Sequence, residues 1–347
     1  MRAVVVERYG PPEVARIVEQ PDPVPGPGQV LVRVEASTVN SGDARIRAGR
    51  FPEGFGPVAR LAFGFRGPRR PVLGNVVSGV IVAVGPAPRG RAAARLADTP
   101  AARLAVGDRV CGMTGVAMGA HAELVAIARG KLALIPAEVS FEDAAGVLFG
   151  GSTALHYLTD KGGIRAGHRV LVIGASGAVG TSAVQLAKHV GAHVTAITSA
   201  RNAALASELG ADRVVDYRAM PPEELDERFD LVLDTVGALS PATGRPLLAD
   251  GGRLLLVVAS LVETITARGP VKTGPAPERA EGFATLLGLI AEGRLRVVHE
   301  PALPLDRIAE AYALVDSGRK VGNLVVHPQP ASARRDSTQQ TPERTPS

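Results

Sequence analysis

A strand, a glycine-rich turn and a helix follow one another directly between residues 169 and 190, and this arrangement constrains the fold more than any other feature. The apolar run 170–173 passes into the turn 174–180, after which apolar residues recur at helical spacing. Further β-branched runs follow at 193–198 and 213–217, separated by a second helical pattern. Apolar strands that alternate with helices are typical of a parallel sheet. The sequence therefore predicts an α/β fold.

The glycine turn has the spacing of a dinucleotide-binding loop. Gly177 allows the backbone to come close to a pyrophosphate, and Gly180 allows the helix to pack tightly on the strand. The unpaired N–H groups at the start of the helix attract phosphate oxygens. A glycine-rich turn without a ligand would leave the same pattern, but its place between a strand and a helix favours a nucleotide site. The expected turn ligands are Ala175, which replaces the usual first glycine, and Ser176, Gly177, Ala178, Val179 and Gly180.

The residues at the end of the second strand bear on the choice of cofactor. A site for NAD needs an acidic residue there, about 20 residues beyond the glycines, to bind the ribose 2′-hydroxyl. This chain instead has Ser199 and Arg201. A guanidinium beside a hydroxyl suits a 2′-phosphate, because it makes bidentate, charge-assisted hydrogen bonds. We therefore expect NADPH as the cofactor. The alternative is that Arg201 is a solvated residue at the start of a helix.

The length of the chain and the distribution of its prolines and glycines indicate more than one domain. Its 347 residues exceed what a single ordinary core contains. Up to residue 126, short strands separated by proline and glycine favour a compact β-barrel-like domain, with an Ala/Arg-rich insertion at 86–104 that we expect on the surface. Residues 127–265 hold the alternating strands and helices. The segment 329–347 is rich in Pro, Ser, Gln and Arg and is expected to be disordered.

Composition argues against several classes of protein. The net charge of +5 arises from arginines in loops and near the chain end, so we expect no nucleic-acid binding. The single cysteine, Cys111, excludes an internal disulfide framework and a thiolate metal cluster. The stretch 170–187 is uncharged, but its glycines and hydroxyl groups make it a poor membrane segment. The opening residues lack the pattern of a signal peptide, and we expect a cytoplasmic protein.

Several motifs match a known family in order along the chain. They are the glycine turn and residues 1–5, 9–12, 39–43, 106–110, 151–154, 209–212 and 318–320. With these pieces the chain resembles the medium-chain dehydrogenase/reductase superfamily. Within that superfamily it is similar to the zinc-independent NADPH:quinone oxidoreductase group, which includes zeta-crystallin. The match extends from residue 1 to near residue 327.

The resemblance implies an inserted-domain architecture and further site residues. A Rossmann NADPH-binding domain at 127–265, with a doubly wound parallel sheet, is expected within a GroES-like β-rich catalytic domain. That domain is built from residues 1–126 and a returning segment at 266–328, with the cofactor in the cleft. A homodimer joined through the Rossmann sheets is also implied. Thr153 is expected beside the cofactor and Tyr217 at its 2′-phosphate, and the other expected cofactor-binding residues are Val236, Gly237 and Asn323.

The same resemblance bears on metal binding. Zinc alcohol dehydrogenases of this superfamily hold their catalytic zinc through Cys, His and Cys, and the corresponding positions here are Asn40, Asn75 and Phe149. A phenyl group cannot ligate zinc, and amides are poor ligands for it. The cysteine-rich structural zinc loop is missing as well. We therefore expect no metal site.

A zinc-free member of this group implies an acceptor that takes up hydride readily. Small-molecule quinones and α,β-unsaturated carbonyl compounds do so, because the negative charge spreads over a conjugated oxygen. We expect Asn40 to act as an amide donor near the nicotinamide or the substrate oxygen. Asp43 is expected to shape the same turn, although a turn-stabilising Asx residue is an equal alternative. Phe51 stands where the enoyl-thioester reductase branch has a tyrosine acid, which argues against acyl-thioester reduction.

Two other functions stay open at this point. One is a metal-free NADP-dependent alcohol or ketone oxidoreductase. The other is a non-catalytic NADPH-binding protein, such as a redox sensor or an RNA-associated form, because the loop arginines and the lack of a clear acid or base fit it.

Overall fold

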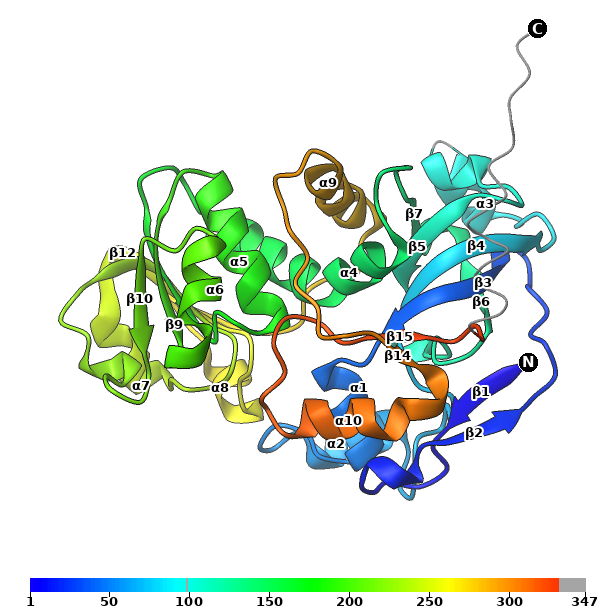
Figure 1. The fold of residues 1–347 in the computed structure, drawn as a ribbon, viewed down its shortest axis with the longest axis horizontal. Coiled ribbons are helices and arrows are strands. Elements are labelled where there is room, and N and C mark those ends of the chain that lie inside the picture. Colours follow the sequence, from blue (N-terminus) through cyan, green and yellow to red (C-terminus); the bar gives the residue numbers. More distant parts are fainter. Residues whose placement is uncertain (98, 331–347) are drawn as a thin grey trace, which may run out of the picture.

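Two lobes lie side by side in the computed structural model, which describes residues 1–97 and 99–330 (Figure 1). Within these residues, one lobe is built on a parallel sheet and the other on a largely antiparallel sheet. Helix α4 (Phe141–His156) and helix α9 (Ala280–Ala291) lie between them, with α9 at the top of the view and α4 below it. Ser140 caps α4, because its Oγ accepts a hydrogen bond of 3.0 Å from the Asp143 N–H.

The parallel sheet has the strand order β10-β9-β8-β11-β12-β13, and every neighbouring pair is parallel. The chain moves outward from β8 on one side and then resumes at β11 on the other, so the sheet is doubly wound. This confirms the predicted α/β fold with a Rossmann-type sheet. The strands are β8 (Arg169–Ile173), β9 (His193–Thr198), β10 (Arg213–Asp216), β11 (Phe229–Asp234), β12 (Leu248–Leu256) and β13 (Val271–Lys272).

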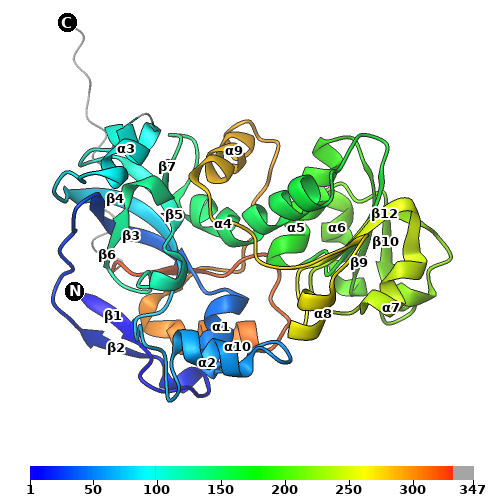
Figure 2. The same ribbon diagram turned by 180° about the vertical axis from the view of Figure 1, so that it is seen from behind.

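Helices cover both faces of this sheet, which is why its central strands are apolar throughout. In β8, residues 170–173 are all buried, with alternate side chains entering different core clusters. On one face pack α4, α5 (Ala178–His189) and α6 (Ala203–Glu208). Helices α7 (Pro241–Gly244) and α8 (Leu261–Thr266) lie toward the other face, as the reverse view shows (Figure 2).

The second lobe combines strands from both ends of the chain. Strand β15 pairs antiparallel with β3, so the last strand of the described chain belongs to the sheet that the first hundred residues begin. The sheet consists of β3 (Gln29–Thr38), β4 (Val76–Val84), β5 (Arg109–Met113), β6 (Leu124–Ala128), β7 (Leu132–Leu134), β14 (Leu303–Pro304) and β15 (Val325–His327), beside the hairpin of β1 (Arg2–Val5) and β2 (Arg16–Glu19). Its helices are α1 (Ser41–Ala48), α2 (Gly56–Phe63), α3 (Arg91–Ala97) and α10 (Ile308–Asp316).

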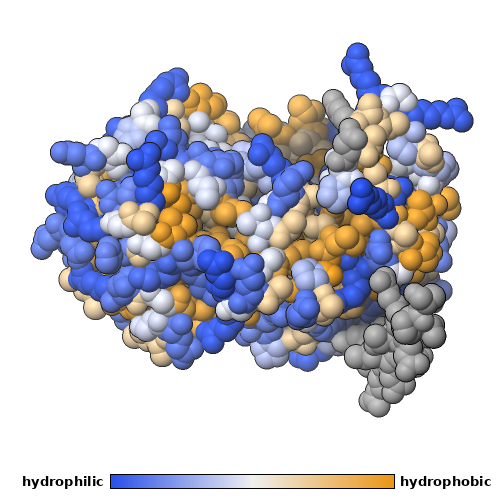
Figure 3. All heavy atoms as spheres, turned by 90° about the horizontal axis from the view of Figure 1, so that it is seen from above, coloured by the Kyte–Doolittle hydropathy of each residue, from blue (hydrophilic) through white to orange (hydrophobic). Residues whose placement is uncertain are grey.

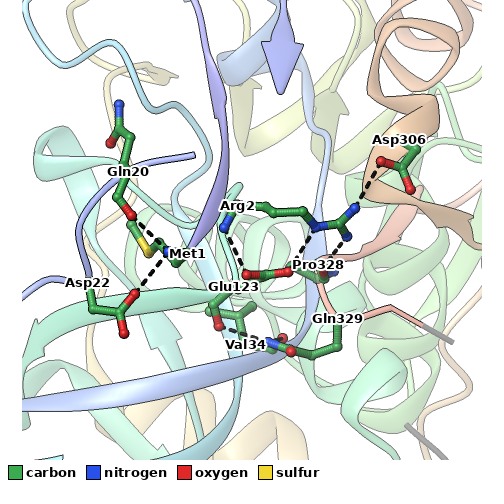
Figure 4. Close-up of polar contacts among 9 residues, drawn as sticks. All are labelled: Met1, Arg2, Gln20, Asp22, Val34, Glu123, Asp306, Pro328 and Gln329. Atoms are coloured by element: carbon green, nitrogen blue, oxygen red, sulfur yellow. Dashed lines mark hydrogen bonds and ion pairs between the residues drawn. The ribbon is translucent and has the colours of Figure 1, made fainter. Parts of the chain in front are cut away.

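Polar contacts around Arg2 tie the two chain ends together (Figure 4). The Arg2 guanidinium pairs with Glu123 at 2.9 Å and with Asp306 at 3.1 Å. Gln329 is buried, and its Nε2 donates to the carbonyl oxygens of Val34 and Glu123. Defined packing therefore continues to residue 329. Most of the tail expected to be disordered, residues 331–347, lies outside the described residues.

The Ala/Arg-rich insertion is helical and lies at the edge of the second lobe. It contains α3 and a short 3₁₀ turn, Pro100–Arg103. Ala101 and Leu104 are buried in the core beneath it, so this surface insertion is anchored by apolar contacts.

The surface seen from above carries both hydrophilic and hydrophobic side chains (Figure 3). Seen from above, hydrophobic side chains form separate patches among polar ones (Figure 3). None of the helices in the described part of the chain combines the length and the apolar character that a membrane-spanning helix needs.

A short backbone stretch at 322–324 links the two lobes. The Gly322 N–H donates to the Ser176 carbonyl at 2.8 Å, in the glycine turn, and the Val39 N–H donates to the Leu324 carbonyl at 3.0 Å. Gly322 has a φ of +59°, and a Cβ built there would lie 2.1 Å from the Val298 carbonyl oxygen. Only glycine fits this position without moving the backbone.

Replacing Gly322 by alanine is expected to destabilise the fold more than the same change at Gly318. Both glycines have a left-handed φ, but a Cβ at Gly318 meets nothing within 4 Å. Gly318→Ala should therefore cost only about 1–2 kcal/mol for the left-handed backbone. Gly322→Ala should add about 1–3 kcal/mol because the neighbouring backbone must shift. Urea-induced unfolding measures both, and equal losses would contradict the crowding at Gly322.

Candidate functional site

A cavity of about 820 Å³ opens at the carboxyl ends of β8, β9 and β10. This is the edge of a doubly wound sheet at which ligands bind. Six of the residues predicted to bind the cofactor line it: Ser176, Gly177, Ser199, Arg201, Tyr217 and Val236. The loop at 318–320, far away in the sequence, closes one side of the same cavity.

The glycine turn has two glycines with different surroundings. A Cβ on Gly180 would lie 2.1 Å from the Gly174 carbonyl oxygen, so α5 packs against the turn at van der Waals contact. A Cβ on Gly177 would meet only the Gly174 carbonyl oxygen, at 3.4 Å, so the cavity side of Gly177 is open. Gly174 itself has a φ of +80° and makes the sharp turn out of β8. The backbone therefore leaves room for a phosphate at Gly177 and none at Gly180.

Hydrogen bonds hold the loop after β9 against the glycine turn. The Ser176 Oγ accepts from Thr198 Oγ1 at 2.9 Å and from Asn202 Nδ2 at 3.0 Å. The Arg201 guanidinium donates to the Arg319 carbonyl at 2.8 Å, which uses one of its five N–H groups. Arg201 is exposed and keeps its remaining donors at the cavity wall.

The cavity wall is strongly basic. Four cationic side chains line it, whereas the lining contains one carboxylate, the exposed Glu223. Lys320 is half-buried, donates to the Gly322 carbonyl, and has a pKa lowered to about 8 by partial burial, against the effect of Glu300. The local sequence pattern did not identify three of the four cations, although the stretch 318–320 carried part of the family resemblance. The cations are Arg201, Arg218, Arg319 and Lys320.

Asp234 organises the loop after β11. The sequence pattern did not identify this residue either. Its buried carboxylate accepts from the N–H groups of Val236 at 3.0 Å, Gly237 at 2.9 Å and Leu239 at 2.7 Å. Burial raises its pKa, and the hydrogen bonds act against that rise. This carboxylate holds Val236 in the cavity wall. An aspartate at the end of an apolar strand, just before Val-Gly, is the signal that could have pointed to it.

The other expected cofactor-binding residues do not line this cavity. Thr153 lies on α4 and donates to the Phe149 carbonyl at 2.7 Å. Asn323 is buried, and its Nδ2 donates to the Val298 carbonyl at 3.1 Å. Five more of the expected residues are absent from the lining as well: Ala175, Ala178, Val179, Gly180 and Gly237.

The Asn40 side chain caps α1 and also joins a second amide. Its Oδ1 accepts from the N–H groups of Gly42 at 2.8 Å and Asp43 at 3.1 Å, and its Nδ2 donates to Asn75 Oδ1 at 2.9 Å. The Asp43 carboxylate accepts from the Asn40 N–H at 3.1 Å and completes a capping box. Asp43 is 1% exposed, and burial raises its pKa to about 7. In this geometry Asp43 shapes the turn and orients Asn40.

The three positions that match zinc ligands in the related alcohol dehydrogenases lie close together. Asn40 and Asn75 are hydrogen-bonded, and the Phe149 ring lies 3.8 Å from the place where a Cβ on Gly42 would stand. Two amides and a phenyl group therefore occupy this corner. In residues 1–97 and 99–330, no group of three or more His, Cys, Asp or Glu side chains is placed to hold a metal ion.

A buried polar cluster fixes α1 against α10. The fully buried Arg47 guanidinium donates to the Gly10 carbonyl, pairs with Asp316 and lies 5.1 Å from the centre of the Tyr312 ring. His121 is also fully buried, and burial lowers its pKa to about 4. It is therefore neutral near pH 7, and its Nε2 lies 3.0 Å from the Thr38 carbonyl oxygen. These contacts hold the helix that carries Asn40.

The matches to protein families cover both lobes. Residues 26–137 match the alcohol dehydrogenase GroES-like domain, and residues 209–326 match the zinc-binding dehydrogenase family. The first match covers most of the antiparallel lobe. The second spans the later strands of the Rossmann-type sheet and the return to β15.

Similar proteins include oxidoreductases of several kinds. A chloroplastic quinone oxidoreductase of Triphysaria versicolor is 28% identical over 94% of this chain and 98% of its own length. The chloroplastic NADPH-dependent alkenal/one oxidoreductase of Arabidopsis thaliana is 29% identical over 95% of this chain and 80% of its own length.

Among solved structures, the quinone oxidoreductase of Coxiella burnetii has a TM-score of 0.81 at 26% identity, over 95% of this chain and 99% of that one. A mycobacterial protein solved in complex with NADPH has a TM-score of 0.75 at 31% identity, over 94% and 100%. The strand order, the glycine turn, the two family matches and these full-length likenesses lead to one conclusion: the chain belongs to the medium-chain dehydrogenase/reductase superfamily, in its quinone oxidoreductase group.

Proposed function

We propose that this oxidoreductase is zinc-independent and uses NADPH to reduce quinones or α,β-unsaturated carbonyl compounds by hydride transfer. The observation that carries the proposal is the link at 322–324, which joins the basic dinucleotide cavity to the paired amides of Asn40 and Asn75. A cofactor site and a polar turn suited to a carbonyl oxygen are thereby held in one frame.

The cavity supports NADPH over NADH through its charge. Arg201, Arg218, Arg319 and Lys320 face it, against the single carboxylate of Glu223. A 2′-phosphate adds about 1.5–2 negative charges to the cofactor at neutral pH, and guanidinium groups bind phosphate bidentately. Tyr217, 46% exposed at the cavity wall, offers a hydroxyl beside the same cations. The open face of Gly177 suits the pyrophosphate.

The chemistry at the amide turn follows from the groups present. When bound, the nicotinamide supplies the hydride. Asn75 keeps its own Nδ2 group while its Oδ1 accepts from Asn40, so the amide pair can still donate to a carbonyl oxygen. These neutral donors stabilise a delocalised oxyanion but do not replace a Lewis acid. A conjugated acceptor therefore fits this turn better than a simple alcohol.

Four further features are proposed with this function. The protein is cytoplasmic and acts on a small molecule. It forms a homodimer through its Rossmann sheets, which size-exclusion chromatography with light scattering would test. No nucleic-acid partner is proposed, because solvated loop arginines account for the net positive charge.

The proposed function predicts metal-independent turnover. Chelator-treated protein is expected to consume NADPH with a small benzoquinone or an aliphatic enone, and to oxidise a secondary alcohol with NADP⁺ poorly or not at all. Absorbance at the NADPH band, against a blank without acceptor, measures this. Activity that disappears with the chelator and returns with zinc would contradict the zinc-free proposal. Tight NADPH binding without turnover of any acceptor would favour a non-catalytic binding protein.

Arg201→Ala, alone or with Ser199→Ala, is expected to weaken NADPH binding by about 1.5–3 kcal/mol, the scale of a charged hydrogen bond, and to leave NADH binding nearly unchanged. Arg228→Ala is the matched control, because Arg228 is exposed and lies outside the cavity lining. Titration of the cofactor by fluorescence or calorimetry measures the affinities. Equal losses for both cofactors would show that Arg201 does not hold the 2′-phosphate.

The variants Asn40→Ala and Asn40→Ser separate the helix-capping role of Asn40 from its proposed role as an amide donor in catalysis. Alanine removes both, whereas serine keeps a helix-capping oxygen and removes the amide that contacts Asn75. Alanine should cost about 1 kcal/mol in stability and serine much less. Both should lower kcat at least about tenfold with little change in NADPH affinity. A serine variant with normal turnover would leave Asn40 only its capping role.

A further inference from the structure

A second cavity, of about 420 Å³, lies between α1 and α2 on one side and the segment after β12 on the other. In both ribbon views, α8 lies close to α1 and α2 at the lower edge of the gap between the lobes (Figures 1 and 2). The Leu261 N–H donates to the Glu53 carbonyl at 2.8 Å and closes this edge. The cavity therefore takes part of its wall from each lobe.

Most of this wall is apolar, and part of it is flat. Phe51, Phe55 and Phe63 come from the loop before α2 and from its end, and Val257 and Val258 face them from the other lobe. The Phe51 and Phe63 rings are stacked, with centroids 5.9 Å apart and planes 8° apart. Flat aromatic walls suit a planar conjugated ring, which can stack on them or contact their edges.

Among the described residues, Arg45 on α1 is the one charged residue of this wall, and no carboxylate of that part of the chain lines the cavity with it. Its guanidinium makes no ion pair or side-chain hydrogen bond within residues 1–97 and 99–330, in contrast to Arg47 two positions on, which pairs with Asp316. Arg45 is half-buried, and burial lowers its pKa. Placing an unpaired cation in apolar surroundings costs free energy, which an anionic ligand would recover.

We propose that the natural acceptor carries a carboxylate, which pairs with Arg45 while the conjugated part of the molecule lies among Phe51, Phe55 and Phe63. The proposal rests on the proposed reductase function and specifies its substrate class. A guanidinium presents a planar fork that matches a carboxylate with two parallel hydrogen bonds.

The positions of Asn40 and Arg45 bear on the length of the acceptor. Asn40 caps the start of α1, and Arg45 lies within α1, about 7.5 Å further along the axis and about 140° around it. An acceptor that reaches both groups must therefore carry its carboxylate several bonds away from the carbonyl group that is reduced. In the reduction, the quinone takes up a hydride from NADPH and a proton from water and becomes the hydroquinone. The carboxylate is unchanged.

The test uses two acceptors that differ only in charge, a benzoquinone with a propionate side chain and its methyl ester. The wild-type protein is expected to prefer the acid at least tenfold in kcat/KM, mainly through KM. In Arg45→Met this acid-to-ester ratio should fall at least tenfold, and in Arg45→Lys it should fall less. Arg50→Met, an exposed arginine outside the cavity lining, is the control and should keep the wild-type ratio.

Two results would overturn the proposal. One is a wild-type protein that reduces acid and ester equally well. The other is an Arg45→Met variant in which both rates fall together while the ratio stays constant, which would place the guanidinium on the carbonyl common to both acceptors.

A binding measurement separates this proposal from the proposed function. Calorimetry of the acid and the ester with NADP⁺-saturated protein, in which no reduction occurs, should show the same tenfold preference and its loss in Arg45→Met. If neither quinone is turned over but the acid binds selectively through Arg45, the reductase function fails while the anion site stands. If the quinones are reduced but bind with equal affinity, the anion site fails alone.

Discussion

Two backbone hydrogen bonds, from Gly322 to Ser176 and from Val39 to Leu324, hold the functional regions of the two lobes in one frame. Without them the glycine turn and the amide turn would belong to separate lobes joined mainly through α4 and its neighbours. The chain passes very close to the neighbouring backbone at this link, because Gly322 lies against the Val298 carbonyl and leaves no room for a side chain. A return of the chain to its first sheet, made by β15 beside β3, brings this stretch to the interface. The loop at 318–320 reaches the dinucleotide cavity for the same reason.

Most of the buried polar side chains described above fix a loop or a helix in place. Asp234 accepts three N–H groups of one loop, Arg47 ties α1 to α10, and Asp43 completes the cap of α1. Each satisfies donors or charges that would otherwise be costly to bury. The cations of Arg201 and Arg45 differ from them, because each lines a cavity and forms no ion pair within the described residues. The contrast between a basic cavity and an apolar cavity with a single described cation is the physical basis for proposing the cofactor in one and the acceptor in the other.

Much of the Rossmann lobe could be predicted, because its signals are local. The run 170–173, the glycine turn and the helix that follows report their structure through spacing alone, and Ser199 and Arg201 lie at the cavity because the end of β9 adjoins the turn in any such sheet. Lys320, Arg319 and Arg218 were not identified by local pattern. Their cationic groups line the cavity through the C-terminal return of the chain and the loop after β10, contacts that local spacing does not encode. The amide contact between Asn40 and Asn75 is equally non-local, since 35 residues separate its partners.

The sequence by itself determined the alternation of strands and helices, the dinucleotide turn and the absence of an acid at the end of the second strand, because these depend on residues adjacent in the chain. Only the tertiary structure decided that Asp43 acts as a capping group and that Asn323 bonds to Val298. It also decided that Arg45 lines an apolar cavity and forms no ion pair with any other described residue. Burial and partner choice depend on which distant segments pack together. The free energy of a charged or polar side chain is set by those neighbours, and its role changes with them.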